Sequence, residues 1–169
     1  KINTDSDRVI RSRKTILDML KSAVDLDDAP DIRKYLDEYN IDPRKSDADI
    51  RYRHDVIDDN PMFVRDYSKC VLCWRCVQVC ADDAQYAFAI NFSGRGNSTC
   101  ISTSFNQELP MTSCVFCGQC IDVCPTGALK TKREWLLESG YTKDQIIQIT
   151  KVKKKKKKRR QEKSYQTGE

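Results

Sequence analysis

Two runs of four cysteines constrain this sequence more than any other feature. Each run has the spacing Cys-x2-Cys-x2-Cys-x3-Cys, and Pro125 directly follows the second run. The runs consist of Cys70, Cys73, Cys76 and Cys80, and of Cys114, Cys117, Cys120 and Cys124. Three closely spaced thiolates can seat on three corners of one iron–sulfur cubane, whereas the fourth cysteine enters a helix and points away. The two runs therefore predict a module organised around two [4Fe–4S] clusters.

The direction of the fourth cysteine predicts a crossed set of ligands. Cluster I is expected to take Cys70, Cys73, Cys76 and Cys124, and cluster II is expected to take Cys114, Cys117, Cys120 and Cys80. Because this interleaving ties the two halves together, cluster insertion and folding are expected to be one event.

Apolar residues between the ligands are expected to exclude water and to tune the reduction potentials. They are Val71, Leu72, Val77, Val79, Val115, Phe116, Ile121 and Val123. Gly118 leaves room for close backbone approach, whereas Trp74 occupies the equivalent position of the first run. We therefore expect the two clusters to differ in exposure and potential.

Other uses of the cysteines are less favoured by their spacing. Zinc ribbons share the Cys-x2-Cys spacing, but a tetrahedral zinc ion does not need a third and a fourth cysteine at these offsets. Clusters that are only structural remain an alternative. The ninth cysteine, Cys100, is distant in sequence from both runs and is expected to be a bystander. His54, the single histidine, has no cysteine nearby and is expected to have no role in the site.

The charge of the chain is unevenly distributed. The net charge is +5, yet residues 151–169 hold ten Lys or Arg and two acidic residues, so the remainder is mildly acidic. The lysine-rich tail is expected to be disordered, with an acidic partner surface as one possible target. Nucleic acid is less favoured, because no aromatic residues interleave with the lysines. Without a signal peptide or an apolar run that could span a bilayer, the chain is expected to be soluble and cytoplasmic.

Periodicity and turn residues divide the chain into three regions. Residues 1–59 are expected to form a helical docking region, with helices at about 8–24 and 30–40. Residues 60–140 are expected to form the two-cluster domain, with a hairpin inserted at 86–102 and a capped helix at 131–139. Residues 141–169 are expected to be an extension that ends in the basic tail. The predicted fold class is α+β.

Several motifs carry a family resemblance. They are Asn60-Pro61-Met62-Phe63-Val64-Arg65-Asp66-Tyr67-Ser68-Lys69-Cys70, Gly94-Arg95-Gly96, Cys114-Val115-Phe116-Cys117-Gly118-Gln119-Cys120 and Val123-Cys124-Pro125-Thr126-Gly127-Ala128-Leu129. Together they resemble the two-[4Fe–4S] ferredoxin-like module of NAD-linked formate dehydrogenase alpha subunits. The same module occurs in the large iron–sulfur subunit of complex I and in iron-only hydrogenases.

The chain departs from these relatives in two places. Their preceding cluster, which one His and three Cys hold, has no counterpart in residues 10–39, where Cys and His are absent. Their catalytic domain follows the module, whereas a basic tail follows it here. The resemblance therefore implies a separately encoded electron relay without the catalyst.

The resemblance implies an electron-transfer subunit of a multisubunit oxidoreductase. It would relay single electrons between a flavin or NADH-oxidising subunit and a catalytic subunit. That catalytic subunit would be molybdenum- or tungsten-dependent, like formate dehydrogenase or benzoyl-CoA reductase, or a hydrogenase. The alternatives are a free ferredoxin and a cluster-containing regulator that binds nucleic acid. No enzyme activity is expected of the isolated chain, because it shows no catalytic constellation.

Overall fold

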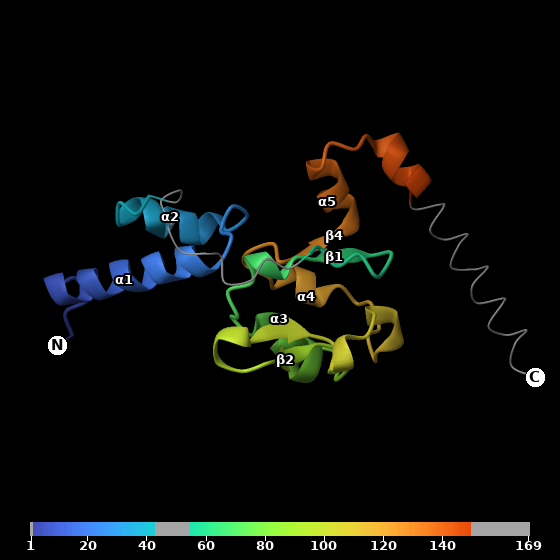
Figure 1. Ribbon diagram of the computed structural model, residues 1–169, viewed down its shortest axis with the longest axis horizontal. Coiled ribbons are helices and arrows are strands. Elements are labelled where there is room, and N and C mark those ends of the chain that lie inside the picture. The colour runs from blue at the N-terminus through green and yellow to red at the C-terminus, as the bar shows by residue number, and fades with distance from the viewer. Residues whose placement is uncertain (1, 43–54, 150–169) are drawn as a thin grey trace, which may run out of the picture.

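The computed structural model describes residues 2–42 and 55–149 (Figure 1). It begins with helices α1 (Asp7–Ala23) and α2 (Pro30–Glu38), which confirm the two helices predicted from apolar spacing. The Ser6 hydroxyl caps α1 by accepting the Val9 N–H at 3.5 Å. Pro30 begins α2, where a missing backbone donor has no cost. The two helices lie side by side and extend to one side of the molecule (Figure 1).

A small apolar core joins these helices to the rest of the chain. Its buried members are Leu26, Ala29 and Leu36, and partly buried residues pack around them. One of those residues is Val71, which belongs to the first cysteine run. The helical pair is therefore packed against the cysteine-bearing part of the chain.

Asp28 adds a polar link between the same two parts. Its carboxylate pairs with the ammonium group of Lys69 and, at 2.9 Å, with that of Lys130. Lys130 also pairs with Glu138 at 2.7 Å. These lysines, with Lys69 first, lower the pKa of Asp28 below its usual range. The link therefore stays charged at neutral pH.

Residues 60–140, called the cysteine module below, mix short strands and short helices. Its strands are β1 (Phe63–Arg65), β2 (Asn91–Ser93), β3 (Cys100–Ser102) and β4 (Leu129–Thr131), and its α-helices are α3 (Arg75–Gln78), α4 (Gln119–Asp122) and α5 (Lys132–Glu138). β1 and β4 are antiparallel, with Val64 opposite Lys130. β2 and β3 form a second antiparallel pair, with Phe92 opposite Ile101. The predicted α+β class is confirmed.

The pairing of β1 with β4 joins the two ends of the cysteine module and encloses its core. The buried core residues are Phe63, Tyr67, Val77, Ile90, Ile101, Leu109 and Leu129. Six cysteines of the two runs pack against them: Cys70, Cys76, Cys80, Cys114, Cys120 and Cys124. Most of the predicted ligands are therefore in contact with the core of the module.

The inserted hairpin is present but shorter than predicted. Its first strand covers only residues 91–93, so the expected strand over 86–90 is wrong. Tyr86 and Phe88 both have φ of 50°, in the left-handed region, which breaks an extended strand. The N–H groups of Ala87 and Phe88 instead donate to the Cys80 carbonyl at 3.0 and 3.3 Å. This segment folds back to close the turn after the first cysteine run.

Helix α5 has the capping box that the sequence predicted. The Thr131 hydroxyl accepts the Glu134 N–H at 3.3 Å, and Gly140 follows the helix with φ of 87°. A further helical turn at residues 143–149 was not predicted, and Ile146 in it is buried. The lysine-rich tail lies outside the described residues. Within the described ranges, no helix is long and apolar enough to span a bilayer.

Candidate metal centres

The two cysteine runs adopt the same backbone conformation. In each loop, the residue two after the first cysteine has positive φ: 54° at Leu72 and 57° at Phe116. Two residues further on, Trp74 and Gly118 have φ of 71° and 81° and cap α3 and α4. Each loop thus curls around its first three cysteines before a helix begins. This is the loop shape that the spacing predicted.

The fourth cysteine of each run lies on a different kind of backbone. Helix α3 continues into a π-helical turn, Val79–Asp83, which contains Cys80. Helix α4 ends at Asp122, so that Cys124 lies just beyond it. Single π-turns inside helices redirect side chains and are frequent at functional sites. Both fourth cysteines are therefore carried away from the loop that precedes them.

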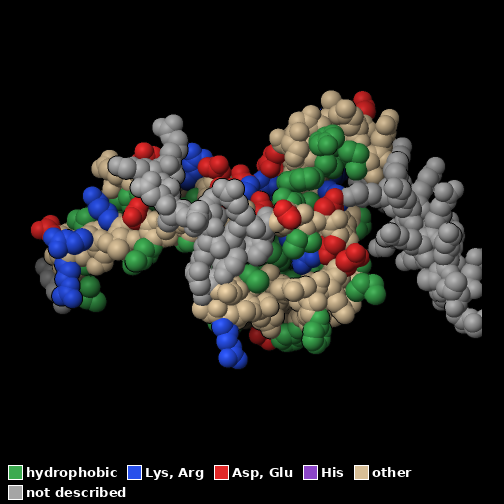
Figure 2. All heavy atoms as spheres, in the orientation of Figure 1, with side chains coloured by type: hydrophobic (Ala, Val, Ile, Leu, Met, Phe, Trp, Pro, Cys, Tyr) green, Lys and Arg blue, Asp and Glu red, His purple; other side chains and the backbone are tan. Residues whose placement is uncertain are grey.

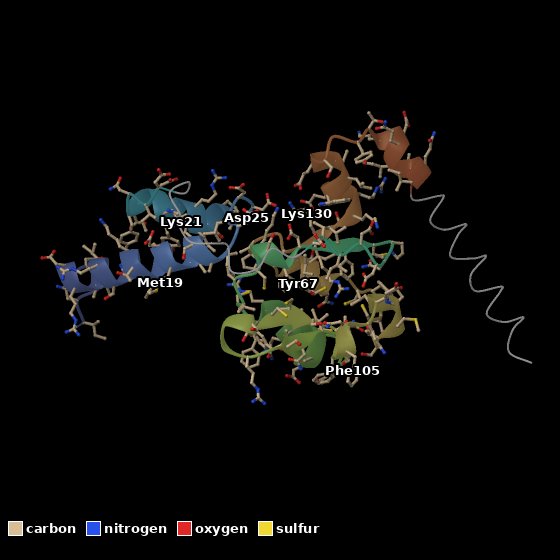
Figure 3. The ribbon with its side chains drawn as sticks, viewed as in Figure 1. Met19, Lys21, Asp25, Tyr67, Phe105 and Lys130 are labelled. Atoms are coloured by element: carbon tan, nitrogen blue, oxygen red, sulfur yellow. The ribbon has the colours of Figure 1, made fainter. Side chains whose placement is uncertain are left out.

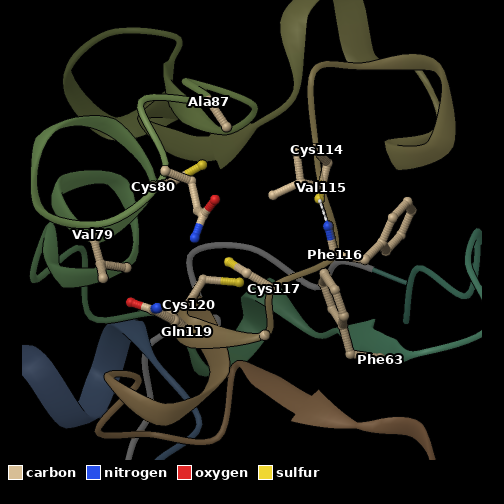
Figure 4. Close-up of a pocket in the computed structure, with 12 residues that line it drawn as sticks. Phe63, Val79, Cys80, Ala87, Cys114, Val115, Phe116, Cys117, Gln119 and Cys120 are labelled. Carbon is tan, nitrogen blue, oxygen red and sulfur yellow. Dashed lines mark hydrogen bonds between the residues drawn. The ribbon is translucent and has the colours of Figure 1, made fainter.

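Cys80 lies with the three loop cysteines of the second run. Cys80, Cys114, Cys117 and Cys120 line one pocket together with Phe63 and Phe116, among other residues. Figure 4 shows these four sulfur atoms around the same space, although they come from two segments of the chain. The Phe116 N–H donates to the Cys114 sulfur at 3.4 Å. Such backbone N–H groups stabilise a thiolate and tune a cluster that it binds.

Cys124 lies correspondingly with the first run. It lines a groove with Cys73 and Trp74, close to the start of α2 at Asp31. Its charge raises the pKa of both Cys70 and Cys76, which places it beside those two thiols. The Thr126 hydroxyl is 3.9 Å from the Cys124 sulfur. The structure thus groups the eight cysteines as four and four, with Cys80 and Cys124 exchanged between the runs.

Burial controls the protonation of the metal-free thiols. Loss of hydration raises the pKa of Cys76 and of Cys120 to about 12, and it also raises the pKa of Cys70 and Cys114. Neighbouring cysteines raise these pKa values further, because thiolates repel one another. Four crowded thiolates are stable only when a cation compensates their charge. These donor sets therefore fit iron, whose binding displaces the protons.

The apolar shell is less complete than predicted. Val77 and Val79 are buried, as expected, but Val115 is 59% exposed. Cys73 and Cys117 are also exposed, as is Trp74, whose ring meets Phe92 edge-on at 6.0 Å. The side chains at the tips of the loops thus face solvent, because the core covers only the inner side of each run. Each site consequently has one solvent-facing edge.

The ninth cysteine lies closer to the site than its place in the sequence indicated. Cys100, in β3, is near enough to Cys70 to raise its pKa, so it is not isolated from the first run. The fold brings the two residues together, which spacing along the chain does not reveal. His54 lies outside the described residues.

The cysteine groups do not have the arrangement of a site for a single metal ion such as zinc. In the described part of the chain, no three His, Cys, Asp or Glu side chains are arranged to hold a single metal ion. Four thiolates on one zinc ion would need sulfur atoms about 3.8 Å apart. A cubane spreads its ligands over four separate iron atoms.

Sequence reasoning did not identify the polar residues beside these sites. Arg65 is 3% exposed and pairs with Asp59. Tyr67 is 7% exposed, and burial raises its pKa. For Arg65, the signal available in the sequence was its alternation with Phe63 before the first run, which places both on one face of the strand.

Comparisons with known proteins agree with this geometry. Residues 60–130 match the family model for the ferredoxin-like domain of NADH-quinone oxidoreductase subunit 3, and residues 113–168 match the model for a 4Fe-4S double cluster binding domain. Among solved structures, a chain of an NAD+-reducing [NiFe]-hydrogenase in the H2-reduced state has a similar fold. Its TM-score is 0.61 at 22% identity, and the match covers 76% of this chain.

The present chain covers 57% of that hydrogenase chain, and the low identity supports similarity of fold alone. The family models indicate an iron–sulfur module. The two groups of four cysteines and the repeated loop geometry agree with them. Residues 60–130 therefore resemble the ferredoxin-like domain of NADH-quinone oxidoreductase subunit 3, and the chain is an iron–sulfur protein that binds two [4Fe–4S] clusters.

Proposed function

We propose that this chain relays single electrons within a multisubunit oxidoreductase and has no catalytic activity of its own. The observation that carries the proposal is the placement of two four-cysteine groups in one module, each with a solvent-facing edge at Cys73 or Cys117. When bound, each [4Fe–4S] cluster takes up and releases one electron. The chain supplies the ligands and the surrounding core, and it brings each site to the surface.

The ligand sets are part of this proposal. Cluster I is held by Cys70, Cys73, Cys76 and Cys124, and cluster II is held by Cys114, Cys117, Cys120 and Cys80. The grouping of Cys80 and Cys124 described above supports this exchange. Since each site draws on both runs, neither run completes its site alone.

Exposed aromatic side chains support a role in contact with other subunits. Trp74 in the first run and Tyr86, Phe88 and Phe105 in the inserted segment are between 54% and 97% exposed. Figure 2 shows hydrophobic side chains at the lower edge of the module, where Figure 1 places β2 and its neighbours. Aromatic residues are enriched at protein interfaces. A diffusing carrier has less need of such a surface, so the subunit is favoured over a free ferredoxin.

The proposed partners follow from the resemblance to the two-cluster modules of larger oxidoreductases. One is a flavin- or NADH-oxidising subunit. The other is a catalytic subunit, either molybdenum- or tungsten-dependent and like formate dehydrogenase or benzoyl-CoA reductase, or a hydrogenase. The fold is similar to that of a chain of an NAD+-reducing [NiFe]-hydrogenase. This similarity supports an assembly in which one subunit reacts with a nicotinamide and another contains a catalytic metal. In the proposed division into residues 1–59, 60–140 and 141–169, the first region contains α1 and α2 and docks onto a partner subunit. The reduced thiols needed for assembly favour the cytoplasm.

Anaerobic purification with natural partners tests the proposal. Two cubanes predict about eight irons per chain, a matching sulfide content and a reducible EPR signal. Large subunits should copurify with the chain. A loaded protein that runs alone supports a free ferredoxin, and steep salt-dependent binding to nucleic acid supports the regulator. Zinc in place of iron contradicts the electron-transfer role.

A further inference from the structure

A buried ion pair lies within the cysteine module. The Arg65 guanidinium contacts the Asp59 carboxylate, and both side chains are more than nine-tenths buried. Asp59 also accepts the Leu109 N–H at 2.8 Å, and the Asn60 side-chain amide donates to it at 3.0 Å. This network fixes the position of the guanidinium. Stability alone does not explain why a cation is retained in the core, because a buried ion pair often contributes little to the stability of a protein.

The strand directs Arg65 toward the cysteines. In β1, Phe63 and Arg65 point to the same face, since side chains two residues apart in a strand do so. Phe63 lines the pocket of Cys114 and contacts the Phe116 ring at a centroid distance of 6.4 Å. Arg65 therefore points to the side of β1 on which Phe63 meets the second cysteine group. The guanidinium is therefore a neighbour of the second site.

One polar group of Arg65 has no partner in the described part of the chain. Its buried Nε–H makes no hydrogen bond there, although Asp59 accepts from the terminal nitrogen. Buried donors are almost always satisfied, so an unsatisfied one next to a metal site suggests an acceptor that belongs to the bound group. Cluster sulfurs and thiolate ligands accept such hydrogen bonds.

Tyr67 connects this cation with the first site. Its buried ring lies in the centre of the cysteine module (Figure 3). Arg65 lies near its hydroxyl, as do Cys70 and Cys76 of the first run. Arg65 thus shares a strand face with Phe63, which lines the second pocket, and lies near the first site by way of Tyr67. Its charge acts on the two sites unequally.

We propose that Arg65 sets the order of the two reduction potentials. Its buried positive charge and its Nε–H raise the reduction potential of cluster II relative to that of cluster I. The reason is electrostatic, because an added electron is stabilised by a nearby cation in a medium of low dielectric constant. Asp59 holds the guanidinium in place and moderates its field. This inference rests on the proposed clusters, and it gives the relay a preferred resting place for the electron at the Cys114 site.

The test is an EPR-monitored redox titration of the anaerobically loaded full chain. Arg65→Gln should weaken the electron affinity of cluster II at least tenfold, which is about 59 mV for a one-electron couple. Cluster I should change less. Asp59→Asn should shift cluster II in the opposite direction, because it removes the negative charge and keeps the positive one.

Controls identify the signals and separate charge from folding. Cys117→Ser should alter the EPR signal of cluster II, and Cys73→Ser should alter that of cluster I. Lys132→Met removes another buried cation, which pairs with Asp58, and should leave both potentials unchanged.

The outcomes separate this inference from the proposed function. If wild-type protein lacks about eight irons, the cluster proposal itself fails. If the loaded Arg65→Gln protein keeps the wild-type potential of cluster II, or Lys132→Met lowers it equally, the role of Arg65 is refuted. Should Arg65→Gln fail to retain iron, the sign of the Asp59→Asn shift decides: an upward shift supports the role, and no shift or a downward one rejects it.

Discussion

Trp74 and Gly118 occupy equivalent positions in the two cysteine loops and share a left-handed backbone, with φ of 71° and 81°. Glycine adopts this conformation without strain, whereas a side chain there costs about 1 kcal/mol. Trp74 also makes the edge-on contact with Phe92, which offsets part of that cost. The fold therefore tolerates strain in the first loop that the second loop avoids.

Gly118→Ala should consequently destabilise the loaded protein by about 1 kcal/mol. A Cβ at this position meets no atom within 4 Å, so the loss comes from backbone strain rather than from a clash. Denaturant unfolding followed by cluster absorbance measures it. Gly96→Ala, which also has positive φ and open space, is the matched control outside the loops. It should be destabilised similarly and leave the EPR spectrum unchanged. An unchanged stability of Gly118→Ala contradicts the strain argument.

Paired cysteine variants test the crossed ligand sets. The double variant Cys80→Ser with Cys114→Ser should damage only cluster II and leave about four irons. Cys76→Ser with Cys80→Ser should damage both clusters, because the two residues serve different sites. Iron analysis and EPR distinguish the results. If each run held its own cluster, the two double variants would give the reverse pattern.

Cys100→Ala should retain about eight irons and both EPR signals. Cys100 lies near Cys70, but Cys70, Cys73, Cys76 and Cys124 already form that group. Cys73→Ala is the matched comparison, since Cys73 is a proposed ligand, and it should lose or alter cluster I. A loss of iron in Cys100→Ala would falsify the bystander role.

Asp28→Asn should loosen the N-terminal helices by about 1 kcal/mol, because Lys69 and Lys130 lose their charged partner while the site stays partly solvated. Hydrogen exchange should then increase in α1 and α2. Asp5→Asn removes an exposed pair with Arg13 and is the control.

The contribution of Asp28 also has a defined pH dependence. Because the folded-state pKa of Asp28 is lowered, the stabilisation is complete above the unfolded-state value of about 3.9 and is lost as pH falls through the folded-state pKa. The attachment should therefore not change between pH 6 and 8. Weaker protection of α1 across that range in wild-type protein, after correction for the intrinsic rise of amide exchange with pH, would contradict the role of Asp28.

Much of the local structure could be predicted from the sequence. Apolar periodicity predicted α1 and α2, and the Thr131 and Glu134 capping box predicted α5, because these signals act within a few residues. The strand expected over residues 86–90 failed for the opposite reason. There, the turn that closes on the Cys80 carbonyl overrides the strand propensity of Tyr86 and Phe88.

The two cysteine runs by themselves determined the kind of metal group, since their spacing is a local property that matches the corners of a cubane. Only the tertiary structure decided what surrounds those runs. Strand β1, which pairs with β4, carries the buried Arg65, and strand β3, which pairs with β2, carries Cys100 near Cys70. Residues far apart in the chain meet only when these elements pack together, so the electrostatic environment of the sites depends on the fold.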